Sequence, residues 1–260
     1  MKKVLGVGFL ALALTACGGG GGSDSSSGGS SNGNNNGGGT ETKVDTVGLY
    51  TGSTNQGQSA IGLIDKNNKF WFLYSPPYKS GVTGFITGNL SVSNSAVSAS
   101  NGKDFYFGGS TVYNTTLNGS VESKKSLKGS VTYTPSNQVT FDTVYDVTMN
   151  KAVANLATIS GSFSGDSAIV QGIESANLTI TNTGVVSGKG QSGCTYAGKV
   201  TAEENTPYYN INLVFGGSPC YMAGQEVKGV AYYDSANKTL YAVAENNSRQ
   251  NAVLFLGTKQ

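Results

Sequence analysis

The sequence predicts an all-β protein in which an N-terminal irregular antiparallel β module is followed by an eight-stranded antiparallel barrel or sandwich, with one short connecting helix. Gly, Ser, Thr, Asn and Tyr are abundant and only 12% of the 260 residues are charged, a composition that favours strands and turns over helices. Short runs of alternating apolar and polar residues are separated by Gly, Asn and Asp, which is typical of strands joined by tight turns.

The first 16 residues are predicted to be a secretory signal peptide. Lys2 and Lys3 form a positively charged start, and an apolar segment follows up to Leu14. Thr15 and Ala16 are the small residues expected before a cleavage site. The apolar segment is too short for a transmembrane helix, so we expect residues 1–16 to be removed on export.

The residue after this cleavage site is Cys17, and Leu14-Thr15-Ala16-Cys17 resembles a bacterial lipobox. The resemblance implies that the Cys17 thiol receives a diacylglyceryl group and that the new amino group is acylated, for example with palmitate. Two or three acyl chains suffice for stable membrane anchoring. An Asp after the cysteine usually assigns such proteins to the inner membrane. Gly18 stands there instead, which implies the outer membrane, on its periplasmic or cell-surface face.

Residues 18–42 consist almost wholly of Gly, Ser and Asn and contain too few apolar side chains to form a core. We therefore expect residues 17–43 to be a lipidated cysteine followed by a flexible tether. A tether of this length has a root-mean-square span of roughly 25 to 30 Å. It would hold the folded part clear of the lipid headgroups.

Loss of the signal peptide removes two of the 17 Lys and Arg residues and leaves a neutral chain with 15 Asp and Glu. Neutrality argues against nucleic acid as a partner, because nucleic-acid binding needs a cationic face. The sequence contains no histidine, which excludes Ser-His-Asp and Cys-His catalytic systems and His-ligated metal sites. We therefore expect no cofactor, no metal and no catalytic residue.

Residues 44–149 are predicted to form the N-terminal β module. The apolar runs 60–64 and 70–74 flank an Asp/Asn-rich turn at 65–69, which indicates a β-hairpin. The second run is apolar at every position, so we expect both of its faces to be covered. Trp71 is its largest side chain and the expected main contributor to the core of this half.

Residues 150–157 break the period of two and match one side of a short helix with Asn150 as its N-cap. Residues 158–260 contain apolar runs at roughly ten-residue intervals, which favours an up-and-down antiparallel barrel or tight sandwich. Gly48–Gly52 resembles Gly161–Gly165, either because one module was duplicated or because hairpins need the same residues. The eight predicted strands are 158–163, 178–180, 185–190, 196–200, 209–215, 227–233, 239–244 and 252–257.

With Cys17 lipidated, Cys194 and Cys220 remain as an even pair in an exported chain, which predicts a disulfide bond. A redox-active pair is the alternative interpretation. It is disfavoured because the sequence has no C-x-x-C motif and no helix N-terminus beside either cysteine to lower a thiol pKa.

Groups that could carry out catalysis give weak signals. Ser235-Ala236-Asn237-Lys238 matches an S-x-x-K motif, but it is predicted to be a hairpin turn whereas the motif needs a helix. Glu203 and Glu204 are adjacent, so they point to opposite faces of a strand. A glycosidase-type carboxylate pair stays open, since residues distant in sequence can meet in space. The other acids considered are Asp104, Glu122, Asp142, Asp146, Asp166, Glu174, Glu226 and Glu245.

The order of parts is a lipobox, a Gly/Ser tether, an irregular β half and an eight-strand half, and the chain ends in Val-Leu-Phe-Leu-Gly-Thr-Lys-Gln at 253–260. This arrangement resembles the surface lipoproteins of the transferrin-binding protein B and factor H binding protein kind. These end in a barrel strand and a Gly-x-Lys-Gln-like tail, and they bind partners through variable loops. The resemblance therefore implies a binding protein and assigns no individual binding residue.

Three hypotheses of function follow. The first is a non-enzymatic outer-membrane lipoprotein that binds a host or envelope protein through its loops, with Tyr78 in a Pro-Pro loop as the first exposed aromatic to test. The second is a lipocalin-like carrier of a small apolar ligand in the C-terminal barrel, which requires a hollow interior. The third is a hydrolase, which requires two acids within about 5 to 10 Å of each other in a cleft.

Overall fold

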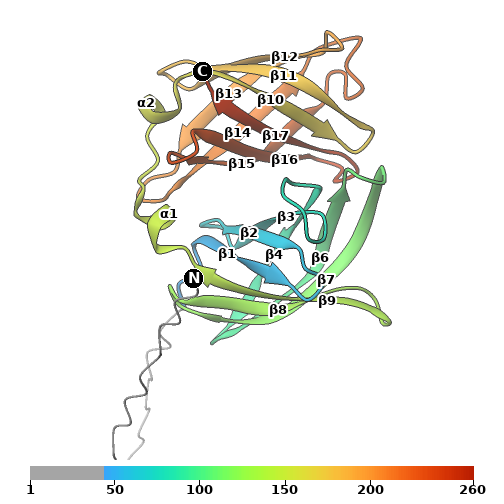
Figure 1. The fold of residues 1–260 in the computed structure, drawn as a ribbon, viewed down its shortest axis with the longest axis vertical. Coiled ribbons are helices and arrows are strands. Elements are labelled where there is room, and N and C mark those ends of the chain that lie inside the picture. The colour runs from blue at the N-terminus through green and yellow to red at the C-terminus, as the bar shows by residue number, and fades with distance from the viewer. Residues whose placement is uncertain (1–43) are drawn as a thin grey trace, which may run out of the picture. The chain divides into compact units, whose positions relative to one another are not determined.

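A computed structural model describes residues 44–260, which form two β-barrels in succession along the chain (Figure 1). The predicted signal peptide, Cys17 and the tether lie outside the described residues. The described part is almost wholly strand, which confirms the predicted all-β class. Within residues 44–260, no helix has the length and apolar character of a membrane span.

The N-terminal half, predicted as an irregular antiparallel β module, is antiparallel and closes into an eight-stranded barrel. Strand β4 (Gly84–Asn89) pairs with β3 (Lys69–Tyr74) on one side and with β6 (Ala96–Tyr106) on the other, and the second pairing closes the sheet. A three-residue strand, β5 (Ser91–Ser93), pairs with the start of β6. The remaining strands are β1 (Gly48–Thr54), β2 (Ser59–Ile64), β7 (Thr111–Glu122), β8 (Ser126–Thr134) and β9 (Asn137–Tyr145).

The C-terminal half is the predicted eight-stranded antiparallel barrel. Its first strand, β10 (Gly161–Ile169), pairs with both β11 (Gly172–Ile180) and the last strand, β17 (Ala252–Lys259), which closes the ring. Two barrels with the same number of strands agree with duplication without deciding it. The other strands are β12 (Val185–Gly190), β13 (Thr195–Ala202), β14 (Tyr208–Phe215), β15 (Glu226–Asp234) and β16 (Thr239–Asn246).

Two short helices connect the barrels, whereas the sequence predicted one helix over residues 150–157. Helix α1 (Val147–Lys151) begins at Asp146, whose side chain accepts a hydrogen bond from the Met149 backbone N–H at 2.8 Å. Helix α2 (Leu156–Ile159) begins at Asn155. Asn150, the predicted N-cap, lies within α1. Its side-chain amide accepts a hydrogen bond from the Leu49 backbone N–H and donates one to the Leu49 carbonyl. The earlier cap at Asp146 explains the shifted boundary.

Strand β3 is buried on both faces, as its unbroken apolar run predicted. Phe70 and Phe72 belong to the core inside the N-terminal barrel. Trp71 and Leu73 lie on the other face, in a core shared with side chains of the C-terminal barrel such as Leu254. Successive residues of a strand point to opposite faces, so one strand contributes to two cores.

Polar contacts accompany this shared core. Glu245 on β16 is buried and pairs with Lys69 (Nζ to Oε1, 2.6 Å) and Arg249 (Nε to Oε2, 2.8 Å). The Arg249 guanidinium also donates to the backbone carbonyls of Thr87 and Asn101 in the first barrel. The buried Glu245 carboxylate therefore has two cationic partners, which offset its loss of hydration.

Candidate ligand cavity in the N-terminal barrel

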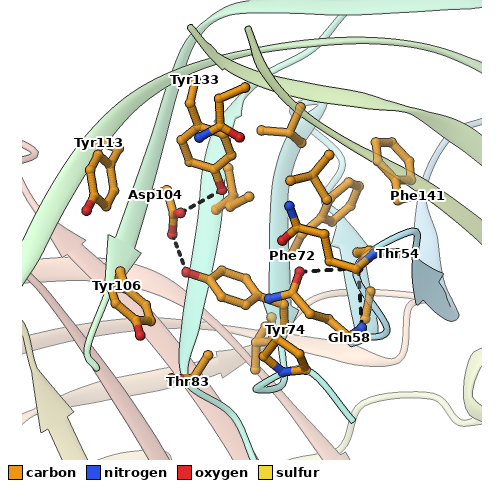
Figure 2. A pocket seen from close by; sticks show the side chains of 18 of the residues that line it. Thr54, Gln58, Phe72, Tyr74, Thr83, Asp104, Tyr106, Tyr113, Tyr133 and Phe141 are labelled. Carbon is orange, nitrogen blue, oxygen red and sulfur yellow. Dashed lines mark hydrogen bonds between the residues drawn. The ribbon is translucent and has the colours of Figure 1, made fainter. Parts of the chain in front are cut away.

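One end of the N-terminal barrel holds a cavity of about 760 Å³ (Figure 2). This volume falls in the range of roughly 300–1,000 Å³ that is typical of small-molecule sites. All eight strands of the closed barrel contribute lining residues, and so do Pro76 and Pro77 from the loop after β3. The cavity is thus part of the barrel interior.

The inner wall of the cavity is apolar. The rings of Phe72 and Phe141 meet edge to face with their centroids 5.6 Å apart. Ile86 and Val131 are buried beside them and also line the cavity. Beyond this wall the rest of the barrel interior is filled by a hydrophobic core. An apolar ligand would therefore rest on aromatic and aliphatic side chains.

Two glycines leave room for the aromatic rings of this wall. A Cβ atom at Gly62 would lie 2.5 Å from the ring of Phe72, its partner on the neighbouring strand. A Cβ atom at Gly84 would lie 2.3 Å from the Tyr74 hydroxyl oxygen. Both distances are shorter than van der Waals contact, so the two glycines allow the rings of Phe72 and Tyr74 to pack against the neighbouring strands β2 and β4.

A buried carboxylate stands at the polar side of the cavity. Asp104 on β6 is 3% exposed, and its two oxygens accept hydrogen bonds from Tyr74 Oη at 2.7 Å and Tyr133 Oη at 2.8 Å (Figure 2). Burial raises the pKa of Asp104 to about 6, and the two hydroxyl donors partly offset the shift. Burial and the nearby carboxylate raise the pKa of Tyr74 and Tyr133, so both remain hydrogen-bond donors.

Two further tyrosines flank Asp104. Tyr113 on β7 is its direct cross-strand partner, and Tyr106 is two residues along β6 and therefore on the same face. Both line the cavity, and the ring of Tyr113 meets that of Tyr133 edge to face at 5.9 Å. Four tyrosines thus surround one carboxylate. Among the described residues that line the cavity, Asp104 is the one with a charged side chain.

The Pro-Pro loop and the turn between β1 and β2 form the rim. The Tyr78 backbone N–H donates to the Gly57 carbonyl at 2.8 Å, and Gln58 Nε2 donates to the Ser75 carbonyl at 3.2 Å. The Tyr78 side chain is 87% exposed, as the sequence predicted. Pro76, two residues before it, lines the cavity. This exposed aromatic therefore stands beside the entrance.

Most of the other acids considered from the sequence have structural partners. Asp146 caps helix α1, and the Glu174 carboxylate accepts from the Ser192 backbone N–H. The S-x-x-K stretch Ser235–Lys238 lies in a hairpin turn, as predicted. Within residues 44–260, no group of three or more Cys, Asp or Glu is placed to hold a metal ion. The candidate acids that form ion pairs with lysines are Glu203 with Lys66, Glu226 with Lys228, Glu122 with Lys125, Asp142 with Lys128 and Glu245 with Lys69.

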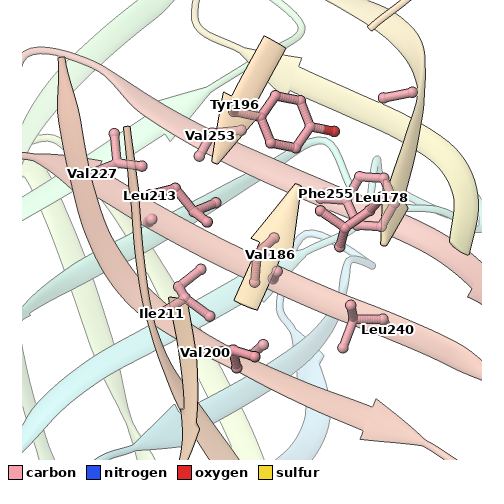
Figure 3. Packing of buried hydrophobic residues seen from close by; sticks show 14 of the residues in the cluster. Leu178, Val186, Tyr196, Val200, Ile211, Leu213, Val227, Leu240, Val253 and Phe255 are labelled. Carbon is pink, nitrogen blue, oxygen red and sulfur yellow. The ribbon is translucent and has the colours of Figure 1, made fainter. Parts of the chain in front are cut away.

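The interior of the C-terminal barrel is filled. Leu178, Val186, Ile211 and Phe255 are among the apolar side chains that meet along its axis (Figure 3). The free space along this axis measures about 40 Å³, and a separate pocket of about 260 Å³ lies beside the disulfide, where Tyr196, Phe215 and Met222 are among the lining residues. The filled axis leaves little room for the apolar ligand that the carrier hypothesis places inside the C-terminal barrel.

The disulfide expected between Cys194 and Cys220 is present. Cys194 immediately precedes β13, and Cys220 lies in the segment between β14 and β15. The bond therefore ties the ten-residue connection 216–225 to the end of the barrel. Both cysteines are buried at the edge of the C-terminal core.

Asp104 was among the candidate acids in the sequence, but the residues that surround it were not predicted. One local pattern could have indicated the site: Asp104 and Tyr106 are two residues apart on one strand, so an acid and an aromatic side chain share a face. Tyr74 and Tyr133 reach Asp104 from 30 and 29 residues away. Contacts across such distances depend on the pairing of β4 with β6, which local patterns do not report.

Comparisons with known proteins leave the family open. No known protein family and no curated protein matches the sequence. Among solved structures, a DUF3598-family protein of unknown function from Nostoc punctiforme matches with a TM-score of 0.31 and 9% identity, over 83% of this chain and 96% of that one. The intact Ap-TbpB structure with its N and C lobes matches with a TM-score of 0.28 and 10% identity, over 84% and 77%. Both scores are too low to decide family or function.

The raised pKa of Asp104 predicts an unusual pH dependence of stability. A folded-state pKa of about 6, against 3.8 for an ordinary aspartate, means that folding favours the protonated form. This contribution is complete below the unfolded pKa and is lost as the pH rises through about 6. Between about pH 4 and pH 7, the wild type should lose roughly 2 kcal/mol of unfolding free energy relative to Asp104→Asn.

Denaturant unfolding at a series of pH values measures this difference. Asp142→Asn is the matched control, because Asp142 lies on the surface with its side chain 63% exposed. Stability curves of the wild type and Asp104→Asn that run parallel over this range would contradict the assignment.

Proposed function

We propose that this protein is a non-enzymatic binding protein of the outer membrane, anchored through lipidated Cys17, whose N-terminal barrel holds a small, largely apolar molecule. The cavity of about 760 Å³ inside a closed barrel carries the proposal. Protein interiors are normally packed as densely as organic crystals, so a space of this size indicates a site. The second barrel has the same number of strands and is filled, so the architecture itself does not demand a cavity.

The residues around the cavity support binding over catalysis. The lining contains one acid and no lysine or arginine, and the sequence contains no histidine. A two-carboxylate hydrolase needs a second acid within about 5 to 10 Å in the same cleft, and Asp104 has none among the lining residues. Hydroxyls and amides such as those of Tyr113, Asn114 and Gln58 suit recognition of a ligand's polar group.

Binding can be tested with two Val→Phe substitutions on the same strand. Val139 lines the cavity, whereas Val144 is 56% exposed. The neutral apolar dye N-phenyl-1-naphthylamine fluoresces more strongly in an apolar site. We expect it to bind the wild type and Val144→Phe equally, and Val139→Phe about tenfold or more weakly, because the added ring occupies cavity volume.

Fluorescence titration gives the three dissociation constants, and native mass spectrometry of freshly purified protein shows any molecule that co-purifies. Failure of the wild type to bind the dye, or equal binding to Val139→Phe, would count against a ligand site in this barrel.

The lipid anchor is tested separately from the cavity. Cys17→Ala removes the thiol that the lipobox resemblance assigns to lipidation. We expect cells that express the wild type to incorporate labelled palmitate into a membrane-bound protein, and cells that express Cys17→Ala to yield an unlabelled protein in the soluble fraction. Equal labelling of the two would contradict the anchor and leave the cavity unaffected.

A host or envelope protein is the second candidate ligand, favoured by the exposure of Tyr78 at the rim. Exposed tyrosines are frequent energetic centres of protein interfaces. A partner recovered from envelope extract or serum should bind Tyr78→Ala at least tenfold more weakly than the wild type in a surface plasmon resonance titration, since truncation at such centres costs about 2 kcal/mol or more. Dye binding in the barrel should not change. Unchanged partner affinity would exclude this loop from the interface.

A further inference from the structure

We infer that the molecule held in the N-terminal barrel carries a primary or secondary ammonium group that donates hydrogen bonds to Asp104, while its apolar body lies against Phe72 and Phe141. This inference rests on the proposed function and adds the chemical class of the ligand. Asp104 has unused hydrogen-bonding capacity, no cationic partner among residues 44–260, and tyrosines around it.

The Asp104 carboxylate has acceptor capacity left over. An ionised carboxylate offers about four lone-pair positions, and Tyr74 and Tyr133 occupy one on each oxygen. Asp104 lines the cavity, so a ligand can supply further donors there. The two tyrosines also hold the carboxylate in one orientation, which lowers the entropic cost of recognising a donor.

The negative charge of Asp104 has no positive partner. None of the ion pairs found among residues 44–260 includes it. Two other carboxylates are buried. Glu245 has two cationic partners in Lys69 and Arg249, and Asp65 accepts hydrogen bonds from the backbone N–H groups of Asn67 and Lys69. A buried charge is costly unless it is paired. A ligand cation would give Asp104 the pairing that the chain gives to Glu245.

The surrounding side chains are suited to a cation. Tyrosine rings attract ammonium groups through their negative faces, and four tyrosines stand around Asp104. Tyr106 and Tyr113 line the cavity without a hydrogen bond to the carboxylate, so their hydroxyls can bond to other polar groups of a ligand.

Other ligand classes fit this arrangement less well. An anion would be repelled by Asp104. A divalent metal ion takes six or more oxygen ligands or a tetrahedral set of nitrogen and sulfur, whereas the lining offers one carboxylate. A neutral alcohol could donate one hydrogen bond to the carboxylate but would leave its negative charge unpaired, whereas an ammonium group offers more donors and also pairs the charge. An ammonium attached to an apolar body therefore uses both sides of the cavity.

The experiment compares a matched pair of ligands. 2-(1-Naphthyl)ethylamine is protonated at neutral pH, and 2-(1-naphthyl)ethanol has the same apolar body with a neutral hydroxyl. We expect the wild type to bind the amine about tenfold or more tightly than the alcohol, because only the amine pairs the buried charge of Asp104. Asp104→Asn should lose this preference while its affinity for the alcohol stays within about threefold.

The design separates the possible failures. Retained alcohol binding shows that Asp104→Asn keeps an intact cavity, and if that variant does not fold, the preference of the wild type decides alone. A wild type that binds the neutral dye but shows no preference for the amine overturns this inference and leaves the proposed function standing. A wild type that binds neither the dye nor the amine overturns both.

Discussion

The double-sided burial of strand β3 is the constraint on which the rest of the structure depends. Alternation along Phe70, Trp71, Phe72, Leu73 and Tyr74 sends every second side chain into the N-terminal barrel and the others into the core shared with the C-terminal barrel. A shift of register by one residue would exchange the two sets, so the pairing of β3 with β2 and β4 is tightly specified. The same alternation carries Tyr74 to the inner face, where it reaches Asp104. The site is therefore fixed by the packing that joins the barrels.

The two barrels differ in how they fill their interiors, although each closes eight strands. In the C-terminal barrel, large aliphatic and aromatic side chains such as Leu178, Ile211 and Phe255 meet across the axis and leave about 40 Å³ of free space there. In the N-terminal barrel such residues occupy one end, while glycine at positions 62 and 84 and hydrogen-bonding side chains occupy the other. Tyrosines in this end need partners for their hydroxyls when buried, and Asp104 serves two of them. The cavity thus arises from the choice of residues at one end of a common architecture.

The sequence was informative wherever structure depends on neighbouring residues. The C-terminal strands and the hairpin of β2 and β3 were predictable because alternation and Asn/Asp turns mark them locally. Closure of the N-terminal barrel was missed because β6, β7 and β8 are rich in Ser, Thr and Asn, and because the decisive pairing of Gly84 with Tyr106 joins residues far apart. The connecting helix was misplaced because two residues, Asp146 and Asn150, could both act as caps, and the choice depends on the contact of Asn150 with Leu49. The cavity combines all these non-local contacts, so its composition was visible in the sequence but its assembly was not.

The energetics of Asp104 connect the fold to the proposed binding role. Orienting two tyrosine hydroxyls does not require a charge, since a side-chain amide can accept from one hydroxyl and donate to the other. A carboxylate in this position adds the cost of removing a charge from water, which the rise of its pKa to about 6 reflects. At neutral pH the site is therefore predominantly ionised, and within residues 44–260 it has no cationic partner. A ligand that brings a positive charge recovers part of that cost when it binds, so its affinity gains from an unfavourable feature of the empty protein. Tyr74 and Tyr133 keep the Asp104 carboxylate oriented before a ligand binds. A buried charge that lowers the stability of the protein alone thus favours the complex with a cationic ligand.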